Sequence, residues 1–315
     1  MNRKVRAHFL LFFTAFIWGS AFVAQSVGME HVGPFTFNTI RMFISGIALT
    51  PLMLILNRGG KNDINVLESS QVAQVTNQSP AQSKKTLYFA GLLCGIILFS
   101  GSTFQQIGLV YTTAGKAGFI TTMYIIMVPL LGVFMKKKIG KRIWFCVILA
   151  VIGIYLLCLV EDLQMNKGDF LMLFSALSYA IHIIVIDHYS HKTDSLKLSH
   201  MQFFVCAFIS LVPMFIFETP DIINISMAWL PLLYAGVLSG AVGFTFQIIA
   251  QKDIKPTVAA LIMSFESVFA VLTGFVILSE ILSAQELFGC LLMFIAIIIA
   301  QLPEKRTVSQ TIKIE

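Results

Sequence analysis

Charged residues are scarce in this chain of 315 residues. They make up 12% of it, whereas an ordinary soluble domain carries about 25%. Apolar residues reach 57%, and the few charges leave long stretches with almost none. This argues against a soluble enzyme, a nucleic-acid-binding protein and a disordered protein. The net charge of +6 would suit a polyanionic partner, but the placement of the charges explains it better. The composition predicts a polytopic membrane protein.

Cysteine patterns and enzyme motifs are also missing. The five cysteines are odd in number, lie in apolar runs and include no C-x-x-C pair: Cys94, Cys146, Cys158, Cys206 and Cys290. A disulfide framework or a zinc site would need clustered spacing. The chain has no G-x-x-x-x-G-K-[ST], D-D-x-x-D, H-E-x-x-H or G-x-S-x-G. We therefore expect no enzymatic activity, no metal and no cofactor.

Ten apolar runs are long enough to cross a bilayer, which needs about 20 residues each. They fall near 8–26, 35–56, 87–110, 114–135, 142–160, 168–188, 199–217, 228–250, 256–278 and 284–302. The first run follows the basic stretch MNRKVRAH, as in a signal peptide, but more membrane helices follow, so we expect an uncleaved span. Residues 57–86 are rich in Gln, Ser and Asn and are predicted to form a flexible cytoplasmic loop.

Lysine and arginine alternate between the connecting segments. Nineteen of the 22 lie in the two tails and in every second loop, whereas the opposite loops hold only Lys116 and Lys167. Short cytoplasmic loops collect positive charge. The pattern predicts a multi-pass protein of the cell membrane with both termini in the cytoplasm.

The chain repeats itself. An offset of 142 lays 99–139 over 241–281 with 10 identities in 41 pairs, and the first spans align at an offset near 161. The two predicted repeats are 8–160 and 168–302. Each has five spans, an odd number, so the second repeat is inverted in the membrane. Inverted repeats are typical of secondary transporters, which bind substrate between the repeats near the midplane.

Several segments resemble the drug/metabolite transporter superfamily, and within it the EamA-type ten-helix permeases. They are FIWGSAFVAQ (16–25), PFTFNTIR (34–41), FQQIGLVYTTAGKAGFIT (104–121), VPLLGVF (128–134), PTVAALIMSFESVFAVLTGFVILSE (256–280) and ELFGCLLMFIAI (286–297). The resemblance implies two five-helix halves around a central cavity, with alternating access and no ATP hydrolysis. Such repeats often end in an acidic residue, which is Glu280 here, but the aligned position in the first half is Lys138.

Three ionisable residues lie within predicted spans, where charge is costly and often marks a pathway. Glu266 is near the midplane and suits either proton coupling or binding of an ammonium group. Arg41 suits capture of an anionic group, or a structural role through backbone carbonyls. His182 shares a helical face with Ser175 and Tyr179 and suits a proton shuttle, or simple packing. Each structural alternative stays open.

Other polar and aromatic residues are predicted to line the same cavity. Gln105 and Gln247 occupy equivalent places in the two repeats, as do Tyr124 and Glu266. Trp18, Tyr124 and Tyr179 lie too deep to be interfacial anchors. The candidate substrate-binding residues are thus Trp18, Arg41, Gln105, Tyr124, Tyr179, His182, Gln247 and Glu266. Interhelical hydrogen bonding is the alternative for the two glutamines.

The sequence therefore predicts an all-α integral membrane protein with ten transmembrane helices in two inverted five-helix repeats. The expected function is secondary transport of a small polar metabolite, such as an amino acid or a related zwitterion, with export and proton coupling as the favoured mode. The expected partners are the solute, protons and the lipid bilayer, without nucleic acid, and the protein is expected to be a monomer or homodimer. A non-transporting receptor or assembly factor is the main alternative, followed by an intramembrane transferase.

Overall fold

Helices make up the regular structure of the protein. The computed structural model describes residues 3–59, 80–135, 140–158, 166–281 and 283–301, and every regular element in these ranges is helical. The first half contains α1 (Arg3–Met29), α2 (Pro34–Gly59), α4 (Pro80–Leu109), α5 (Ala114–Thr121), α6 (Tyr124–Phe134) and α7 (Lys141–Cys158). The second contains α8 (Lys167–Ser190), α9 (Ser195–Phe217), α10 (Ile222–Met227), α11 (Trp229–Leu233), η1 (Tyr234–Phe244), α12 (Thr245–Gln251), α13 (Pro256–Met263), α14 (Phe265–Leu278) and α15 (Ala284–Gln301).

The predicted spans match these helices. Eight helical stretches of the described residues are long and apolar enough to cross a membrane: Arg3–Met29, Pro34–Ile55, Gln82–Leu109, Ala114–Phe134, Lys167–Ser190, Ser195–Phe217, Trp229–Gln251 and Pro256–Leu278. The fifth and tenth predicted spans are α7 and α15, which have 18 residues each and contain shorter apolar stretches. All ten predicted spans thus coincide with helices, and eight of them are long and apolar enough to cross a membrane.

The predicted loop 57–86 is helical at both of its ends. The second span continues to Gly59 and α4 begins at Pro80. The middle of the predicted loop, 60–79, lies outside the described residues. Its flexibility therefore stays a prediction.

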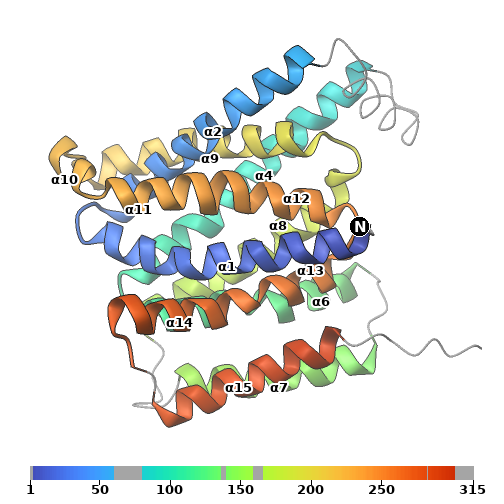
Figure 1. Ribbon diagram of the computed structural model, residues 1–315, viewed down its shortest axis with the longest axis vertical. Helices are drawn as coiled ribbons and strands as arrows, with labels where there is room; N and C mark the ends of the chain where they lie inside the picture. Colours follow the sequence, from blue (N-terminus) through green and yellow to red (C-terminus); the bar gives the residue numbers. More distant parts are fainter. Residues whose placement is uncertain (1–2, 60–79, 136–139, 159–165, 282, 302–315) are drawn as a thin grey trace, which may run out of the picture.

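The helices lie side by side in layers (Figure 1). In this view α2, α4 and α9 lie at the top, α1 with α11, η1 and α12 in the middle, and α13, α14 and α6 below them. The pair α7 and α15 packs together at the lower edge. The first half contacts the second through α1 with α14, α2 with α9 and α4 with α8. The two halves thus interleave along the whole bundle.

Two spans are broken at equivalent places. The fourth span divides into α5 and α6 at Thr122–Met123, and the ninth divides into α13 and α14 at Ser264, which is 142 residues further on. At both breaks the backbone tightens to i→i−3 hydrogen bonds, such as Ile125 N to Thr122 O (2.9 Å) and Ser267 N to Ser264 O (3.1 Å). Pro129 lies inside α6, beyond the first break, so it does not cause that break. The ninth span breaks without a proline at the matching position, Val271.

The eighth span contains a π-helix, η1, of 11 residues. Long π-helices are rare, and π segments are frequent at functional sites. Side chains of neighbouring helices donate hydrogen bonds to its carbonyls. Ser45 Oγ donates to Gly236 O (2.8 Å) and Trp18 Nε1 to Ser239 O (3.0 Å). The π-helix is therefore tied to α1 and α2, next to the centre of the bundle.

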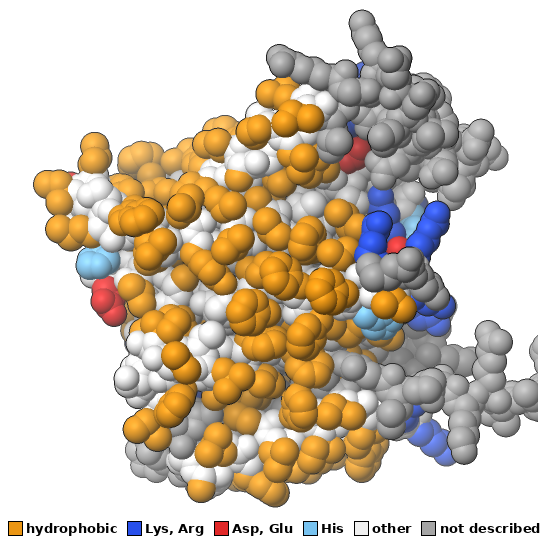
Figure 2. All heavy atoms as spheres, viewed as in Figure 1, with side chains coloured by type: hydrophobic (Ala, Val, Ile, Leu, Met, Phe, Trp, Pro, Cys, Tyr) orange, Lys and Arg blue, Asp and Glu red, His pale blue; other side chains and the backbone are white. Residues whose placement is uncertain are grey.

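The surface is apolar across the helices and charged at one end. In Figure 2 hydrophobic side chains cover the middle of the visible face, and Lys and Arg side chains gather at the right edge, near the N-terminus. We call this edge the basic end; α1 begins there, and α8 and α12 end there, so Lys4, Lys192 and Lys252 belong to it. We call the other the far end, where the turn at Glu30–Gly33, the segment around Glu218 and α10 lie.

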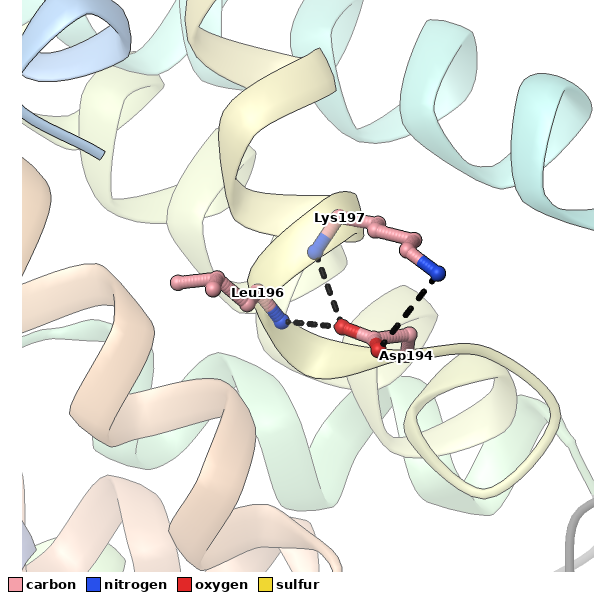
Figure 3. Close-up of polar contacts among 3 residues, drawn as sticks. All are labelled: Asp194, Leu196 and Lys197. Carbon is pink, nitrogen blue, oxygen red and sulfur yellow. Dashed lines mark hydrogen bonds and ion pairs between the residues drawn. The ribbon is translucent and has the colours of Figure 1, made fainter. Parts of the chain in front are cut away.

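At the basic end α9 begins with its own cap. Asp194 Oδ1 accepts hydrogen bonds from the backbone N–H groups of Leu196 (2.9 Å) and Lys197 (3.0 Å), and the Lys197 ammonium lies 4.0 Å from Oδ2 (Figure 3). Such caps stabilise a helix by about 1 kcal/mol.

Gly19 permits a close approach between the backbones of the two halves. A Cβ there would lie 2.5 Å from the carbonyl oxygen of Glu266 and 2.5 Å from Cβ of Phe269. We expect Gly19→Ala to destabilise the protein by about 1–3 kcal/mol, because a backbone atom cannot move aside. Thermal unfolding of the purified protein measures this. Gly101→Ala is the control, since its new Cβ would meet only side-chain atoms at 3.2 Å or more. Equal melting temperatures for the two variants would contradict the expectation.

Candidate functional site

A single cavity collects all eight residues that the sequence predicted for substrate binding. It lies among α1, α2, α4, α5, α6, α8, η1, α12 and α14. Its lining consists of Trp18, Phe22, Gln25, Arg41, Gln105, Thr121, Tyr124, Tyr179, His182, Ile183, Ser239, Phe244, Gln247 and Glu266. Both halves of the chain contribute equally to this list. The placement fits a site between two repeats.

The cavity is narrow. About 510 Å³ is unfilled by atoms, a volume that includes space open to solvent, and the centre of a water molecule reaches only about 40 Å³ of it.

Apolar clusters pack on both sides of the cavity. Toward the basic end, one cluster joins Ala7 and Leu11 of α1 with Val128, Ile254 and Ala259. We call it the inner cluster.

Toward the far end, a second cluster joins Phe22, Leu109, Ala114, Ile120 and Ala270. We call it the outer cluster. Each cluster includes residues that also line the cavity or adjoin it. The cavity thus lies between two apolar clusters, one on each side.

Arg41 is buried and held by neutral side chains. Its Nη1 donates to Gln25 Oε1 (2.9 Å) and its Nε to Asn38 Oδ1 (3.1 Å), while Asn38 Nδ2 donates to Ser210 Oγ (3.1 Å). Its guanidinium carbon lies 5.9 Å from the centre of the Phe37 ring. Among the described residues no carboxylate lies within ion-pair distance of it. The guanidinium is thus fixed in direction but has no counter-ion.

Glu266 lines the same cavity from the other repeat. It lies in the first turn of α14, directly after the helix break, and is 3% exposed. Its Oε1 and the hydroxyl of Tyr124, the first residue of α6, form no hydrogen bond of normal geometry within the described ranges, although the two groups lie close enough to interact with each other. Gln247 Oε1 is also unpartnered. Buried polar atoms without partners are costly, so three of them on one wall indicate a place where a ligand or water completes the hydrogen bonding.

Tyr179 and His182, two further predicted residues, line the same cavity as Arg41 and Glu266. Tyr179 Oη donates to Gln105 Oε1 (3.3 Å), and its position brings it under the electrostatic influence of both Arg41 and Glu266. His182 Nε2 forms a hydrogen bond with Gln202 Oε1 (3.0 Å), and its ring meets Phe244 edge-on at 5.8 Å. His182 thus lines the cavity and is also packed and hydrogen-bonded, so its two interpretations both stay open.

Sequence reasoning missed several members of the site. Gln25, which lies seven residues after Trp18 on α1, was not a site candidate, and Asn38 lies one turn before Arg41. That spacing was the available signal. Ser239 and Phe244 line the cavity through the π-helix, and no sequence pattern indicates a π-helix.

Comparison with known proteins gives the family. The sequence profile of the EamA-like transporter family matches residues 5–159 and 166–301, which together cover nearly the whole chain. The chain belongs to the EamA-like transporter family. The EamA-like chain is 32% identical over 301 residues to an uncharacterized transporter of Archaeoglobus fulgidus, covering 95% of this chain and 87% of that one. It is 25% identical over 285 residues to the uncharacterized transporter YoaV of Bacillus subtilis, covering 88% and 90%.

A solved structure shares the fold. It superposes with a TM-score of 0.68 at 15% identity and covers 93% of this chain and 95% of its own. At this identity the likeness concerns the fold alone. The EamA-like protein is thus a multi-pass membrane transporter with ten helices in two repeats, embedded in lipid. Its relatives are named transporters and not enzymes.

The contacts of Arg41 allow its two interpretations in this EamA-like protein to be separated. If its role is to bind solute, Arg41→Met should leave the melting temperature within a few degrees of wild type or above it, because an apolar side chain of similar volume avoids the cost of burying a charge. Asn38→Leu should lower the free energy of unfolding by about 2 kcal/mol more, since it leaves the charge of Arg41 in place without this hydrogen-bond partner. Thermal unfolding of both purified variants is the measurement. If Arg41→Met lowers the melting temperature as much as Asn38→Leu does, the role of Arg41 is structural.

Proposed function

We propose that this protein is a secondary transporter that moves a small zwitterionic metabolite, of the amino-acid type, across the cell membrane by alternating access. The observation that carries the proposal is the joint placement of Arg41 and Glu266. Both line one cavity, both are nine-tenths or more buried, and neither has an ion-pair partner among the described residues.

Two buried groups of opposite charge that do not pair with each other suit a ligand that carries both charges. A guanidinium binds a carboxylate through a fork of two hydrogen bonds, and Gln25 and Asn38 hold it in one orientation. An ammonium group would find Glu266, Tyr124 and Gln247 at the unpartnered wall. The eight predicted residues form the proposed binding site, and Trp18 adds an apolar wall together with Phe22 and Phe244.

The narrow cavity supports alternating access. Apolar clusters lie on two sides of it, and the two broken spans supply hinges at equivalent positions. Discontinuous helices at the midplane are a recurrent device of secondary transporters. Parting the inner cluster would open the site to one face, and parting the outer cluster would open it to the other.

Direction and coupling complete the proposal. The basic end carries the N-terminus, and short cytoplasmic loops collect Lys and Arg, so we place both termini in the cytoplasm. We propose export as the direction. Glu266 is the proposed carrier of a coupling proton when the substrate amine leaves it, because an ionised carboxyl without a partner is costly at this depth.

Metabolite profiling tests the substrate proposal. Cells that overexpress wild-type protein should release a zwitterionic compound into the medium, and Glu266→Gln and Arg41→Met should each reduce this release at least about 10-fold. One lost charge-assisted hydrogen bond of about 1.5–3 kcal/mol is worth that much. Untargeted mass spectrometry of medium and cytosol is the measurement.

The matched control is Glu30→Gln, which makes the same chemical change at an exposed position outside the cavity. It should release the compound at the wild-type rate. A compound that is released equally by Glu266→Gln and wild type, at equal amounts of inserted protein, would contradict the site. Release of a compound without an amine would contradict the substrate class.

The orientation has its own test. Single cysteines introduced at Lys192 and at Glu30, in a variant without native cysteines, should differ in their reaction with a membrane-impermeant maleimide. In intact cells only the cysteine at position 30 should react, since it lies at the far end, and the one at position 192 should react after permeabilisation. The reverse pattern would place the basic end outside.

A further inference from the structure

The acidic residue that ends the ninth span has a contact that the proposed function does not use. Glu280 lies just beyond α14, in the second half of the chain, and its carboxylate reaches α5 in the first half. Oε1 accepts a hydrogen bond from the backbone N–H of Ala114 (2.9 Å) and Oε2 accepts one from Gly115 (3.1 Å). One repeat therefore caps a helix of the other.

We infer that Glu280 is the latch of the gate at the far end: its hydrogen bonds to α5 hold α5 and α14 together while that end is closed, and they separate when it opens. This inference rests on the proposed alternation of access. To that proposal the inference adds two details: the helices that move apart are α5 and α14, and the contact that holds them together is made by Glu280.

The cap satisfies the helix end completely. The first four N–H groups of a helix have no partner within the helix. In α5 the first two donate to Glu280, Lys116 N donates to Thr113 Oγ1 (3.3 Å) and Ala117 N donates to Thr113 O (2.9 Å). A carboxylate at a helix N-terminus is further favoured by the helix dipole. Removing Glu280 from α5 exposes two donors, so this contact resists opening.

The backbone before Glu280 is shaped for this contact. Ser279 has φ 57° and ψ 28°, and no other non-glycine residue of the described ranges has a positive φ. Such a residue costs about 1 kcal/mol and persists where the surroundings hold it. The turn brings Glu280 N to Gly274 O (3.2 Å) and directs the side chain back along α14. A Cβ at Gly274 would lie 2.7 Å from Glu280 Oε2, so glycine leaves room for the carboxylate.

The two helices joined by Glu280 are the far-end pieces of the two broken spans. They lead from the breaks at Thr122–Met123 and Ser264 toward the far end, and both contribute to the outer cluster, through Ala114 and Ala270 among others. The breaks can act as hinges. The latch therefore lies where the pieces would separate.

The equivalent contact is not formed at the basic end by the residues that the sequence provides. The offset of 142 pairs Glu280 with Lys138, which lies outside the described residues and carries no carboxylate, and pairs Ala114 with Pro256, which has no N–H to donate. The helix α13 has no side-chain cap. Closure there relies on the apolar inner cluster. The departure of Lys138 from the family pattern thus has a physical meaning: within the part of the chain that the structure describes, a carboxylate latches α5 to α14 at the far end and no equivalent latch joins α6 to α13 at the basic end.

Cysteine accessibility tests the latch without a known substrate. In a variant without native cysteines, Ser239→Cys places a thiol in the cavity wall. A membrane-impermeant methanethiosulfonate is applied to the far face or to the basic face of oriented vesicles. With Glu280→Gln, labelling from the far face should be about 5-fold faster, the factor expected for one lost cap, and labelling from the basic face should not accelerate.

Two matched controls make the same acid-to-amide change at other caps. Glu218 accepts hydrogen bonds from Phe35 N (2.8 Å) and Thr36 N (2.7 Å) at the far end, but it joins α9 to α2, outside the outer cluster. Asp194 caps α9 at the basic end (Figure 3). Glu218→Gln and Asp194→Asn should leave far-face labelling within about 2-fold of the parent, since distant sites act independently. An equal acceleration in all three variants would reduce the effect to general destabilisation and overturn the latch.

Gly274→Ala keeps the charge and displaces the carboxylate by the clash described above. It should accelerate far-face labelling as Glu280→Gln does, and the two changes together should add little, which keeps the test decisive if Glu280→Gln folds poorly. Labelling that reaches the introduced thiol at position 239 but responds to neither change overturns the latch and leaves the transporter proposal standing. A thiol that no variant exposes to either face overturns both.

Discussion

The cost of placing charge inside an apolar bundle governs this structure. Arg41 and Glu266 lie deep among helices whose outer faces are lined by hydrophobic side chains, and neither neutralises the other. Unpaired charges at membrane depth are tolerated where a cavity or polar neighbours receive them. Neutral amides hold the guanidinium, while the carboxyl faces atoms that have no partner. A ligand that supplies both missing charges would offset the free energy that this arrangement costs.

The helix breaks explain how such a site can exist in a membrane. A continuous helix would satisfy its own backbone and present Tyr124 and Glu266 on rigid rods. Breaking the fourth and ninth spans directly before these residues places each of them in the first turn of a new helix at the cavity. Irregular backbone at membrane depth is tolerated only where protein or a cavity surrounds it. The same two breaks that build the site therefore also supply places where the halves can bend.

Most of the architecture could be predicted from the sequence, because span length and the placement of Lys and Arg follow directly from the physics of the bilayer. The eight candidate residues converge on one cavity for a related reason: polar groups in apolar runs must face something other than lipid. Asn38 as a support for Arg41, and Glu280 as a cap for α5, could not be predicted with the same methods. Those contacts depend on which helices become neighbours, and a hydropathy pattern carries no such information.

The asymmetry between the two ends follows from a few substitutions in otherwise equivalent repeats. Where α13 begins with Pro256, α5 begins with Ala114, whose N–H donates to a carboxylate of the other half. A proline at the first helical position costs the helix nothing, because that donor has no partner within the helix, but it removes the possibility of a carboxylate bridge. Among the described residues, one end of the bundle thus has a carboxylate bridge in addition to its apolar cluster, and the other has apolar packing at the equivalent place. Hydrogen bonds break over a short distance and apolar contacts yield gradually, so the two ends need not open with equal ease even though the helices around them are built from the same repeat.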